Sequence, residues 1–237
     1  MIKAIFFDLD GTLLPLHEET FERIYFSLLC QKMMPYGYEP KQLMKTIFCG
    51  IEKMMANDGK KTNEEVFWDT FISIYGEEKR KDEEIFASFY THEFLETKKA
   101  CKENPLAKEI IQFCREHFPY VVLATNPIFP RIATQMRMEW IGLTNDDFSF
   151  VTTYENSCFS KPNPAYFQML MKKFHLQPDE VLVFGNHEYE DGECAYQAQI
   201  KCYLIDHCLI RDERAKHVCP KIHMEDVIPI LKKYISE

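Results

Sequence analysis

The chain has 237 residues, of which 46% are hydrophobic and 27% are charged, and its formal net charge is −9. A chain of this length can bury a sizeable core, in one large domain or two unequal ones. The acidic balance argues against binding nucleic acid through a basic face, although a local positive site for an anion stays open. No window approaches the roughly 20 apolar residues of a membrane span, so we expect neither nucleic acid nor a membrane as a partner.

The cysteines and the N-terminus bear on the cellular compartment. Nine cysteines occur without a C-x-x-C pair, which is more typical of reduced thiols than of a disulfide framework. The opening residues, MIKAIFFDLDG, reach two acids before an apolar signal-peptide region is complete. The sequence therefore predicts a cytoplasmic protein.

The first predicted element is a strand over residues 2–9, and it ends in two acids. Asp8 and Asp10 lie one residue apart and are followed at once by Gly11 and Thr12. Alternation along a strand points both carboxylates the same way, and Gly11 lets the backbone turn sharply after them. Such a pair suits a hard divalent cation, or a nucleophile with a proton carrier. The plainer alternative is an Asx turn that ends the strand.

Residues 17–97 show helical patterns and no convincing strand. The predicted helices cover residues 18–34, 40–57, 63–76 and 82–96. We expect this segment to be an all-helical cap subdomain inserted after the first strand. Residues 1–16 and 98–237 then form an α/β core.

From residue 104 onward, predicted helices and strands alternate. The helices cover residues 104–118, 129–142 and 164–176, and the strands cover 119–124, 148–153, 180–184 and 200–205. The alternation predicts a doubly wound parallel sheet. Ligands bind such sheets at the carboxyl ends of the strands, which is where the two acids of the first strand lie.

Polar residues follow three further predicted strands. Thr125 and Asn126 follow the second strand, Lys161 precedes a helix start after the third, and Asn186 and Asp191 follow the fourth. Each is weak evidence alone, because such residues are common in loops. Together with the two acids of the first strand, they predict a site for a phosphate group and Mg²⁺.

These residues stand in four motifs that resemble those of the haloacid dehalogenase superfamily. The motifs are FDLDGTL (7–13), ATN (124–126), SKPNP (160–164) and VFGNHEYEDGECA (183–195), in the family's order and spacing. The resemblance is to the phosphatase branch with a helical cap between the first and second motifs. It implies a Rossmann-like core and covers essentially the whole chain.

The resemblance also implies catalytic and phosphate-binding roles. Asp8 attacks phosphorus and forms an aspartyl-phosphate, while Asp10 protonates the leaving alcohol and then activates water. Thr125 and the backbone of Asn126 hold phosphate oxygens. Lys161 neutralises the phosphate and the nucleophile, in accord with the need to screen two anions that approach each other.

The implied metal site contains the one departure from the family's pattern. Mg²⁺ is expected between the Asp8 carboxylate, the Asp10 carbonyl and the fourth motif, here Asn186 and Asp191. That motif usually begins Gly-Asp in the family, whereas this chain has Gly185-Asn186. Asn186 can offer a carbonyl oxygen to the ion but no charge.

The expected activity is Mg²⁺-dependent hydrolysis of a phosphomonoester, with a small phosphorylated metabolite as substrate. A phosphosugar mutase shares every core motif and stays open. A haloacid dehalogenase shares the nucleophile, although Asp10 argues against it. Asn186 also permits a regulatory protein that binds phosphate with little turnover.

Overall fold

The computed structural model describes residues 1–235, which contain one six-stranded parallel sheet in the order β3-β2-β1-β4-β5-β6. The strands are β1 (Ala4–Phe7), β2 (Tyr120–Leu123), β3 (Phe150–Val151), β4 (Val181–Gly185), β5 (Lys201–Ile205) and β6 (Lys221–Ile222). The predicted parallel α/β sheet is confirmed, and five strands overlap their predicted ranges. The sixth was missed because no apolar run marks it: Ile222 stands between Lys221 and His223.

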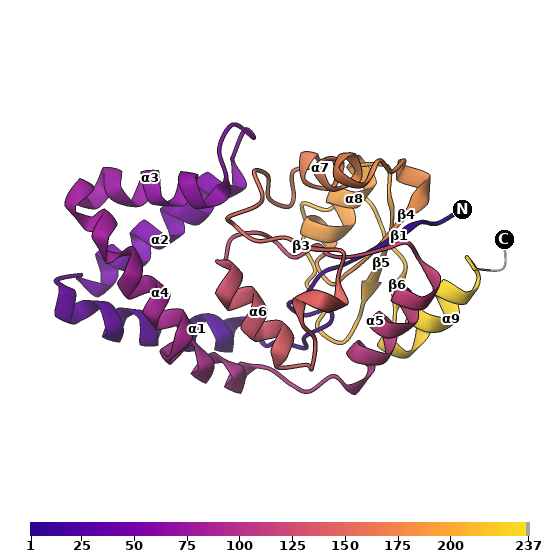
Figure 1. Ribbon diagram of the computed structural model, residues 1–237, viewed down its shortest axis with the longest axis horizontal. Helices are drawn as coiled ribbons and strands as arrows, with labels where there is room; N and C mark the ends of the chain where they lie inside the picture. Colours follow the sequence, from indigo (N-terminus) through magenta and orange to yellow (C-terminus); the bar gives the residue numbers. More distant parts are fainter. Residues whose placement is uncertain (236–237) are drawn as a thin grey trace.

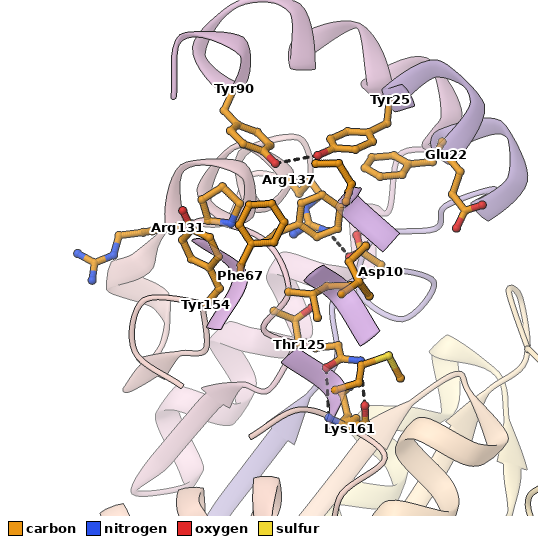
Figure 2. Close-up of a pocket in the computed structure, with 18 of the residues that line it drawn as sticks. Asp10, Glu22, Tyr25, Phe67, Tyr90, Thr125, Arg131, Arg137, Tyr154 and Lys161 are labelled. Carbon is orange, nitrogen blue, oxygen red and sulfur yellow. Dashed lines mark hydrogen bonds and ion pairs between the residues drawn. The ribbon is translucent and has the colours of Figure 1, made fainter. Parts of the chain in front are cut away.

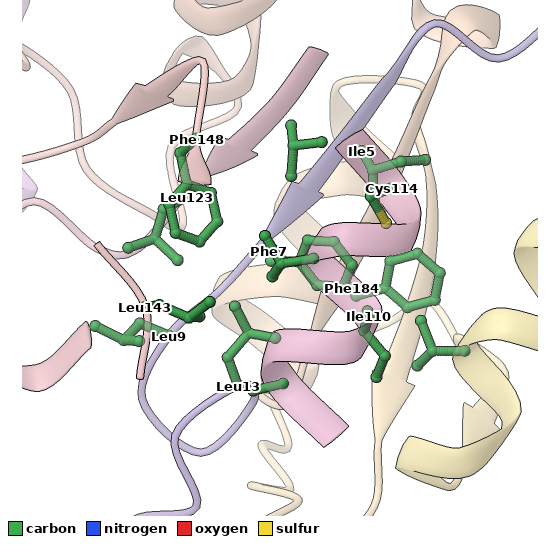
Figure 3. Packing of buried hydrophobic residues seen from close by; sticks show 14 of the residues in the cluster. Ile5, Phe7, Leu9, Leu13, Ile110, Cys114, Leu123, Leu143, Phe148 and Phe184 are labelled. Atoms are coloured by element: carbon green, nitrogen blue, oxygen red, sulfur yellow. The ribbon is translucent and has the colours of Figure 1, made fainter. Parts of the chain in front are cut away.

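Strand β1 lies in the middle of the sheet and is buried on both faces. It pairs with β2 from Ala4↔Tyr120 onward and with β4 from Ala4↔Val181 onward. Ala4 and Phe6 pack into the core on one face. Ile5 and Phe7 pack into the core on the other (Figure 3). This position explains the uninterrupted apolar run before the two acids.

Helices cover both faces of the sheet (Figure 1). Residues of α5 (Pro105–His117) and α9 (Val227–Lys232) pack against one face, and residues of α7 (Ala165–Phe174) and α8 (Cys194–Gln197) pack against the other. The predicted start of α7 is right to within one residue. Asn163 Oδ1 accepts a hydrogen bond of 3.0 Å from the Ala165 N–H and so caps the helix.

The chain between β1 and α5 contains helices and no named strand. It contains α1 (Glu18–Met33), α2 (Pro40–Met55), α3 (Asn63–Tyr75), α4 (Glu83–Thr91) and a 3₁₀ segment (Glu93–Ala100). Aromatic side chains from these helices form a second core, to which Ala133 and Met136 of the later helix 131–139 also contribute. The predicted fourth helix breaks at His92, and helical structure continues to Ala100, three residues past the expected boundary at 97.

The two connections between this helical segment and the sheet run side by side in opposite directions. The His17 N–H donates to the Ala100 carbonyl and the Lys102 N–H donates to the Pro15 carbonyl, each at 2.9 Å. Leu16 and Cys101 form an antiparallel bridge between them. Helix α6 (Arg131–Glu139) lies between the helical segment and the sheet (Figure 1). Within residues 1–235, no helix is both long and apolar enough to cross a bilayer.

Candidate active site

A cavity of about 650 Å³ lies at the carboxyl ends of the strands, beneath the helical segment. All seven residues that the sequence singled out line it: Asp8, Asp10, Thr125, Asn126, Lys161, Asn186 and Asp191. Figure 2 shows Lys161 at one end of the cavity, with Thr125 and Asp10 above it. The strand ends therefore bring together the side chains that were expected to meet.

The Lys161 ammonium group lies between two buried carboxylates. Its Nζ donates to Asp8 Oδ1 at 2.8 Å and to Asp191 Oδ1 at 2.6 Å, and only 1% of Lys161 is exposed. Burial by itself would lower the pKa of Lys161, but the carboxylates of Asp191 and Asp8 raise the pKa well above its ordinary value. The side chain is therefore a fixed positive charge beside the end of β1.

Asp8 is held at the end of the central strand. Its backbone N–H donates to the Phe184 carbonyl at 2.9 Å, which continues the pairing of β1 with β4. Burial raises the pKa of the Asp8 carboxyl to about 7, although the nearby Lys161 opposes this shift. An incoming cation would favour the ionised form, which is the form that can act as a nucleophile.

Asp10 is paired with a cation that the sequence did not reveal. Arg137 Nη1 donates to Asp10 Oδ2, while Arg137 Nε donates to the Ala133 carbonyl at 3.1 Å. The guanidinium lies over the Phe129 ring, 4.5 Å from its centre, and Arg137 is almost fully buried. Arg137 thus fixes one oxygen of Asp10 from the α6 side. No local pattern signals this role, because the two residues are 127 positions apart.

The turn after β1 fits closely against Asn186. Gly11 has a φ of +78°, and a Cβ added there would lie 2.1 Å from Asn186 Nδ2. Asn186 Oδ1 accepts from Thr12 Oγ1 at 3.1 Å, and its Nδ2 donates to the Cys208 carbonyl at 2.8 Å. The DGT sequence is therefore needed both for the backbone conformation and for the approach of the fourth motif.

The Asp191 carboxylate accepts three hydrogen bonds. Its Oδ2 accepts from the backbone N–H groups of Asn186 and His187, each at 3.0 Å, and its Oδ1 is held by Lys161. A Cβ at Gly185 would lie 2.2 Å from the Asp191 carboxyl carbon, so glycine allows this close approach. Asp191 lies in a π-helix (Glu188–Glu193), a feature that is common at functional sites.

Thr125 and Asn126 follow β2 and face the loop that carries Lys161. The Thr125 carbonyl accepts from the Thr152 and Tyr166 hydroxyls at 2.7 and 2.8 Å. Asn126 Nδ2 donates to Glu190 Oε2 at 2.8 Å, and its Oδ1 accepts from the Lys161 N–H at 3.2 Å. The Asn126 side chain thus braces neighbouring loops, which agrees with a phosphate-binding role for its backbone.

A second residue that sequence reasoning missed is Asn63, the first residue of α3. It is fully buried, and its Nδ2 donates to the Pro127 carbonyl and to Ser160 Oγ, each at 2.9 Å. The backbone N–H groups of Asn63 and Glu64 donate to the carbonyls of Ser157 and Tyr154 at 2.8 and 2.9 Å. The start of α3 is therefore fastened to the loop that ends in Lys161.

The oxygen atoms at this edge of the sheet fit Mg²⁺. Asp8 Oδ2 has a weak 3.4 Å contact with Thr12, and Asp10 Oδ1 is buried without a hydrogen-bond partner. Mg²⁺ typically takes one or two carboxylates and completes its shell with waters and substrate phosphate. Among residues 1–235, no three His, Cys, Asp or Glu side chains are grouped to hold a metal by themselves. Such an ion would therefore also need water, phosphate or amide oxygens.

Comparison with known protein families shows which family the chain belongs to. The family described as haloacid dehalogenase-like hydrolase matches residues 2–199. The chain belongs to this family. It is thus a hydrolase, and the superfamily expected from its four motifs is confirmed. No curated protein matches the chain.

Solved structures of this family share the fold over the whole chain. A 2-haloacid dehalogenase from Pseudomonas syringae pv. Tomato has a TM-score of 0.65 at 17% identity, covering 99% of this chain and 100% of its own. A predicted phosphoglycolate phosphatase from Haemophilus somnus gives 0.57 at 18%, covering 97% and 98%. The HAD-hydrolase YfnB from Bacillus subtilis, bound to magnesium, gives 0.59 at 18%, covering 97% and 98%. At such low identity they share the fold, while their activities differ.

Proposed function

We propose that this hydrolase is a Mg²⁺-dependent phosphomonoesterase that acts on a small phosphorylated metabolite through an aspartyl-phosphate. The observation that carries the proposal is the buried Lys161 ammonium between Asp8 and Asp191 at the floor of the cavity. A fixed cation beside a carboxylate at a strand end is what nucleophilic attack on an anionic phosphate requires. The Mg²⁺ would be held by Asp8, the Asp10 carbonyl and Asn186, and it would screen charge on the phosphate. Asp191, whose carboxylate is already engaged, is the weakest of the four expected ligands.

The reaction has two steps in this proposal. An Asp8 carboxylate oxygen attacks phosphorus, the phosphorus–oxygen bond to the substrate breaks, and the leaving oxygen takes a proton from Asp10. Water then attacks the phosphorus of the aspartyl-phosphate and gives a proton to Asp10. Inorganic phosphate leaves and Asp8 is regenerated. The Thr125 hydroxyl, the Asn126 backbone and Lys161 hold the phosphate oxygens in both steps.

We also propose that residues 17–97 act as a cap over a core formed by residues 1–16 and 98–237. The paired connections around Leu16 and Cys101 offer a hinge, and α3 closes the cavity through Asn63. A closed cap excludes water from the nucleophile. A cytoplasmic location fits the nine free cysteines.

Dehalogenation is the main competing activity, since a 2-haloacid dehalogenase shares the fold. Displacement of a halide needs a nucleophile but no acid for the leaving group. Here a second acid, Asp10, lines the cavity and is oriented by Arg137. This arrangement favours a substrate whose leaving group must be protonated.

The deciding test measures phosphate release from a panel of phosphomonoesters, with Mg²⁺ and with EDTA, beside halide release from 2-chloropropionate. We expect Mg²⁺-dependent phosphate release that Asp8→Asn abolishes, because an amide cannot form the phosphoenzyme. Halide release without phosphate release would assign a dehalogenase instead. Activity of Asp8→Asn within tenfold of wild type would remove Asp8 from the nucleophile role.

A further inference from the structure

We propose that the natural substrate has a bulky apolar or aromatic leaving group that carries no second anionic group. This inference rests on the proposed phosphomonoesterase activity. It concerns the part of the cavity above the catalytic residues, where the leaving group would lie.

The cavity is much larger than a phosphoryl group needs. Its volume of about 650 Å³ is within the range of sites for organic ligands of substantial size. Figure 2 shows the catalytic end at Lys161 and the opposite end at Tyr25 and Tyr90, with Asp10 between them. A substrate whose phosphate reaches Asp8 therefore extends its leaving group towards these tyrosines.

The walls around that leaving group are mainly apolar and aromatic. They come from α1, α2, α3 and α4, from the start of α6 and from the loops before it. Examples are Phe21, Phe26, Phe48, Phe67, Trp68 and Phe129. A polyol or sugar would leave the hydroxyls that face these apolar side chains unpaired, which disfavours its binding.

The two tyrosine hydroxyls at the far end are neutral. The Tyr25 and Tyr90 hydroxyls bond to each other at 2.9 Å. Burial raises the pKa of Tyr25 to about 12 and that of Tyr90 well above its ordinary value, so both stay protonated. The pair can serve a single hydroxyl or carbonyl of a leaving group, and it offers no positive charge to an anion.

The charges that line the cavity disfavour a second anion. Six glutamates contribute to its wall: Glu18, Glu22, Glu64, Glu83, Glu155 and Glu190. Burial and neighbouring carboxylates raise the pKa of Glu18 and of Glu64. Two of the cations among the described lining residues, Lys161 and Arg137, are already paired. The third, Arg131, is exposed and extends away from the other labelled side chains (Figure 2).

The test compares esters within two groups whose leaving oxygens have similar acidity. The aryl esters are phenyl phosphate, 2-naphthyl phosphate and 6-carboxy-2-naphthyl phosphate. The alkyl esters are hexyl phosphate, with glycerol 1-phosphate and glucose 6-phosphate as polar references. We expect kcat/KM for the naphthyl ester to exceed that for the phenyl ester by about tenfold, from the added apolar surface. The carboxylate should remove most of this gain, and the polar alkyl esters should be poorer substrates than hexyl phosphate.

Two variants with matched controls tie these preferences to the cavity. Phe67→Ala should lower the naphthyl-over-phenyl ratio several-fold, whereas Ile74→Ala, on the exposed side of the same helix, should not. Glu22→Gln should improve kcat/KM for the carboxynaphthyl ester, whereas Glu19→Gln, on α1 but outside this cavity, should not.

The outcomes separate the two proposals. Phosphate release with equal or better rates for glycerol or glucose phosphates than for hexyl phosphate overturns the leaving-group inference while the phosphatase proposal stands. A carboxynaphthyl ester turned over as well as the naphthyl ester overturns the charge part of the inference. Absence of phosphate release from every ester overturns the proposed activity and this inference with it.

Discussion

Asp8 combines a buried position with a titration near neutrality. Burial raises the pKa of Asp8 to about 7, so the native protein keeps a proton that an unfolded chain, with an ordinary pKa near 4, has lost. The contribution of this group to stability is complete below pH ~4 and is lost as the pH rises through ~7. The asparagine of Asp8→Asn has no such dependence.

We therefore expect the Tm of Asp8→Asn to rise relative to wild type between pH 5 and pH 8. The measurement is thermal unfolding in EDTA, so that no metal stabilises the carboxylate. A Tm difference that stays constant or falls over this range would show that Asp8 is already ionised at pH 5.

Arg137 is the positioning residue that the chain offers for Asp10. Arg137→Met keeps much of the side-chain volume but removes the donor to Asp10 Oδ2. We expect kcat to fall about 10- to 100-fold for alkyl phosphates, and less for aryl phosphates, whose leaving groups need less protonation. Glu139→Gln, at an exposed position on the same helix that does not line the cavity, is the control. Equal losses for both kinds of ester would count against a role through Asp10.

A substitution at Asn186 tests the departure from the family's fourth motif, which usually has Asp at this position. Asn186→Asp adds a charge near the proposed ion, and at ~4 Å with an effective dielectric near 20 the attraction is about 4 kcal/mol. Desolvation, repulsion from Asp8 and loss of the hydrogen bond to the Cys208 carbonyl offset much of it. We expect about tenfold tighter Mg²⁺, or roughly 1.4 kcal/mol.

The readout is the Mg²⁺ concentration for half-maximal activity, with turnover at saturating metal moving less. An unchanged or higher half-saturation would mean that Asn186 is not a ligand. The ion would then rely on Asp8, the Asp10 carbonyl and other oxygens.

At the scale of elements, the contact between the start of α3 and the core loops can be tested by substitution. Asn63→Ala removes the donors to Pro127 and Ser160. We expect faster amide exchange at Asn63 and Glu64, a several-fold higher KM and a retained fold. Thr62→Ala is the control, because Thr62 caps α3 through the Glu65 N–H without bonding to the core loops.

The same exchange experiment reports on closure. Beryllofluoride with Mg²⁺ should slow exchange in the connections near residues 14–18 and 97–104 in wild type, and less so in Asn63→Ala. No change in these connections on binding, in either protein, would indicate a fixed cap.

Elements with a strong local pattern could be predicted from the sequence. Buried strands such as β1 and β4 are short apolar runs, and α7 has both a capping residue and an apolar face. Strand β6 and helix α9 were not predicted, because they are short and depend on packing against β5 and α5. The break at His92 was missed because residues 82–96 keep a continuous helical composition across it.

At the scale of the whole molecule, the site was predictable where chemistry lies next to strand ends. Asp8 and Asn186 directly follow strands and Thr125 lies two residues past one, so a parallel sheet brings them to one edge. Arg137 and Asn63 act through partners far away in sequence, and nothing local marks them. The cavity walls are equally hidden, since the apolar faces of α1–α4 look like ordinary core until the helices are placed.

The central position of β1 has a consequence for synthesis of the protein. The strand that leads to Asp8 leaves the ribosome before the other strands of this sheet, yet one of its two neighbours, β4, begins only at Val181. At ~5–20 residues per second, roughly 10–35 s separate the two strands. During that time Ala4–Phe7 is an apolar segment that has at least one edge without a paired strand. The helices between β1 and α5 have no complete sheet to pack against. Chaperone binding to nascent chains should therefore concentrate on this first segment and end once β4 has emerged.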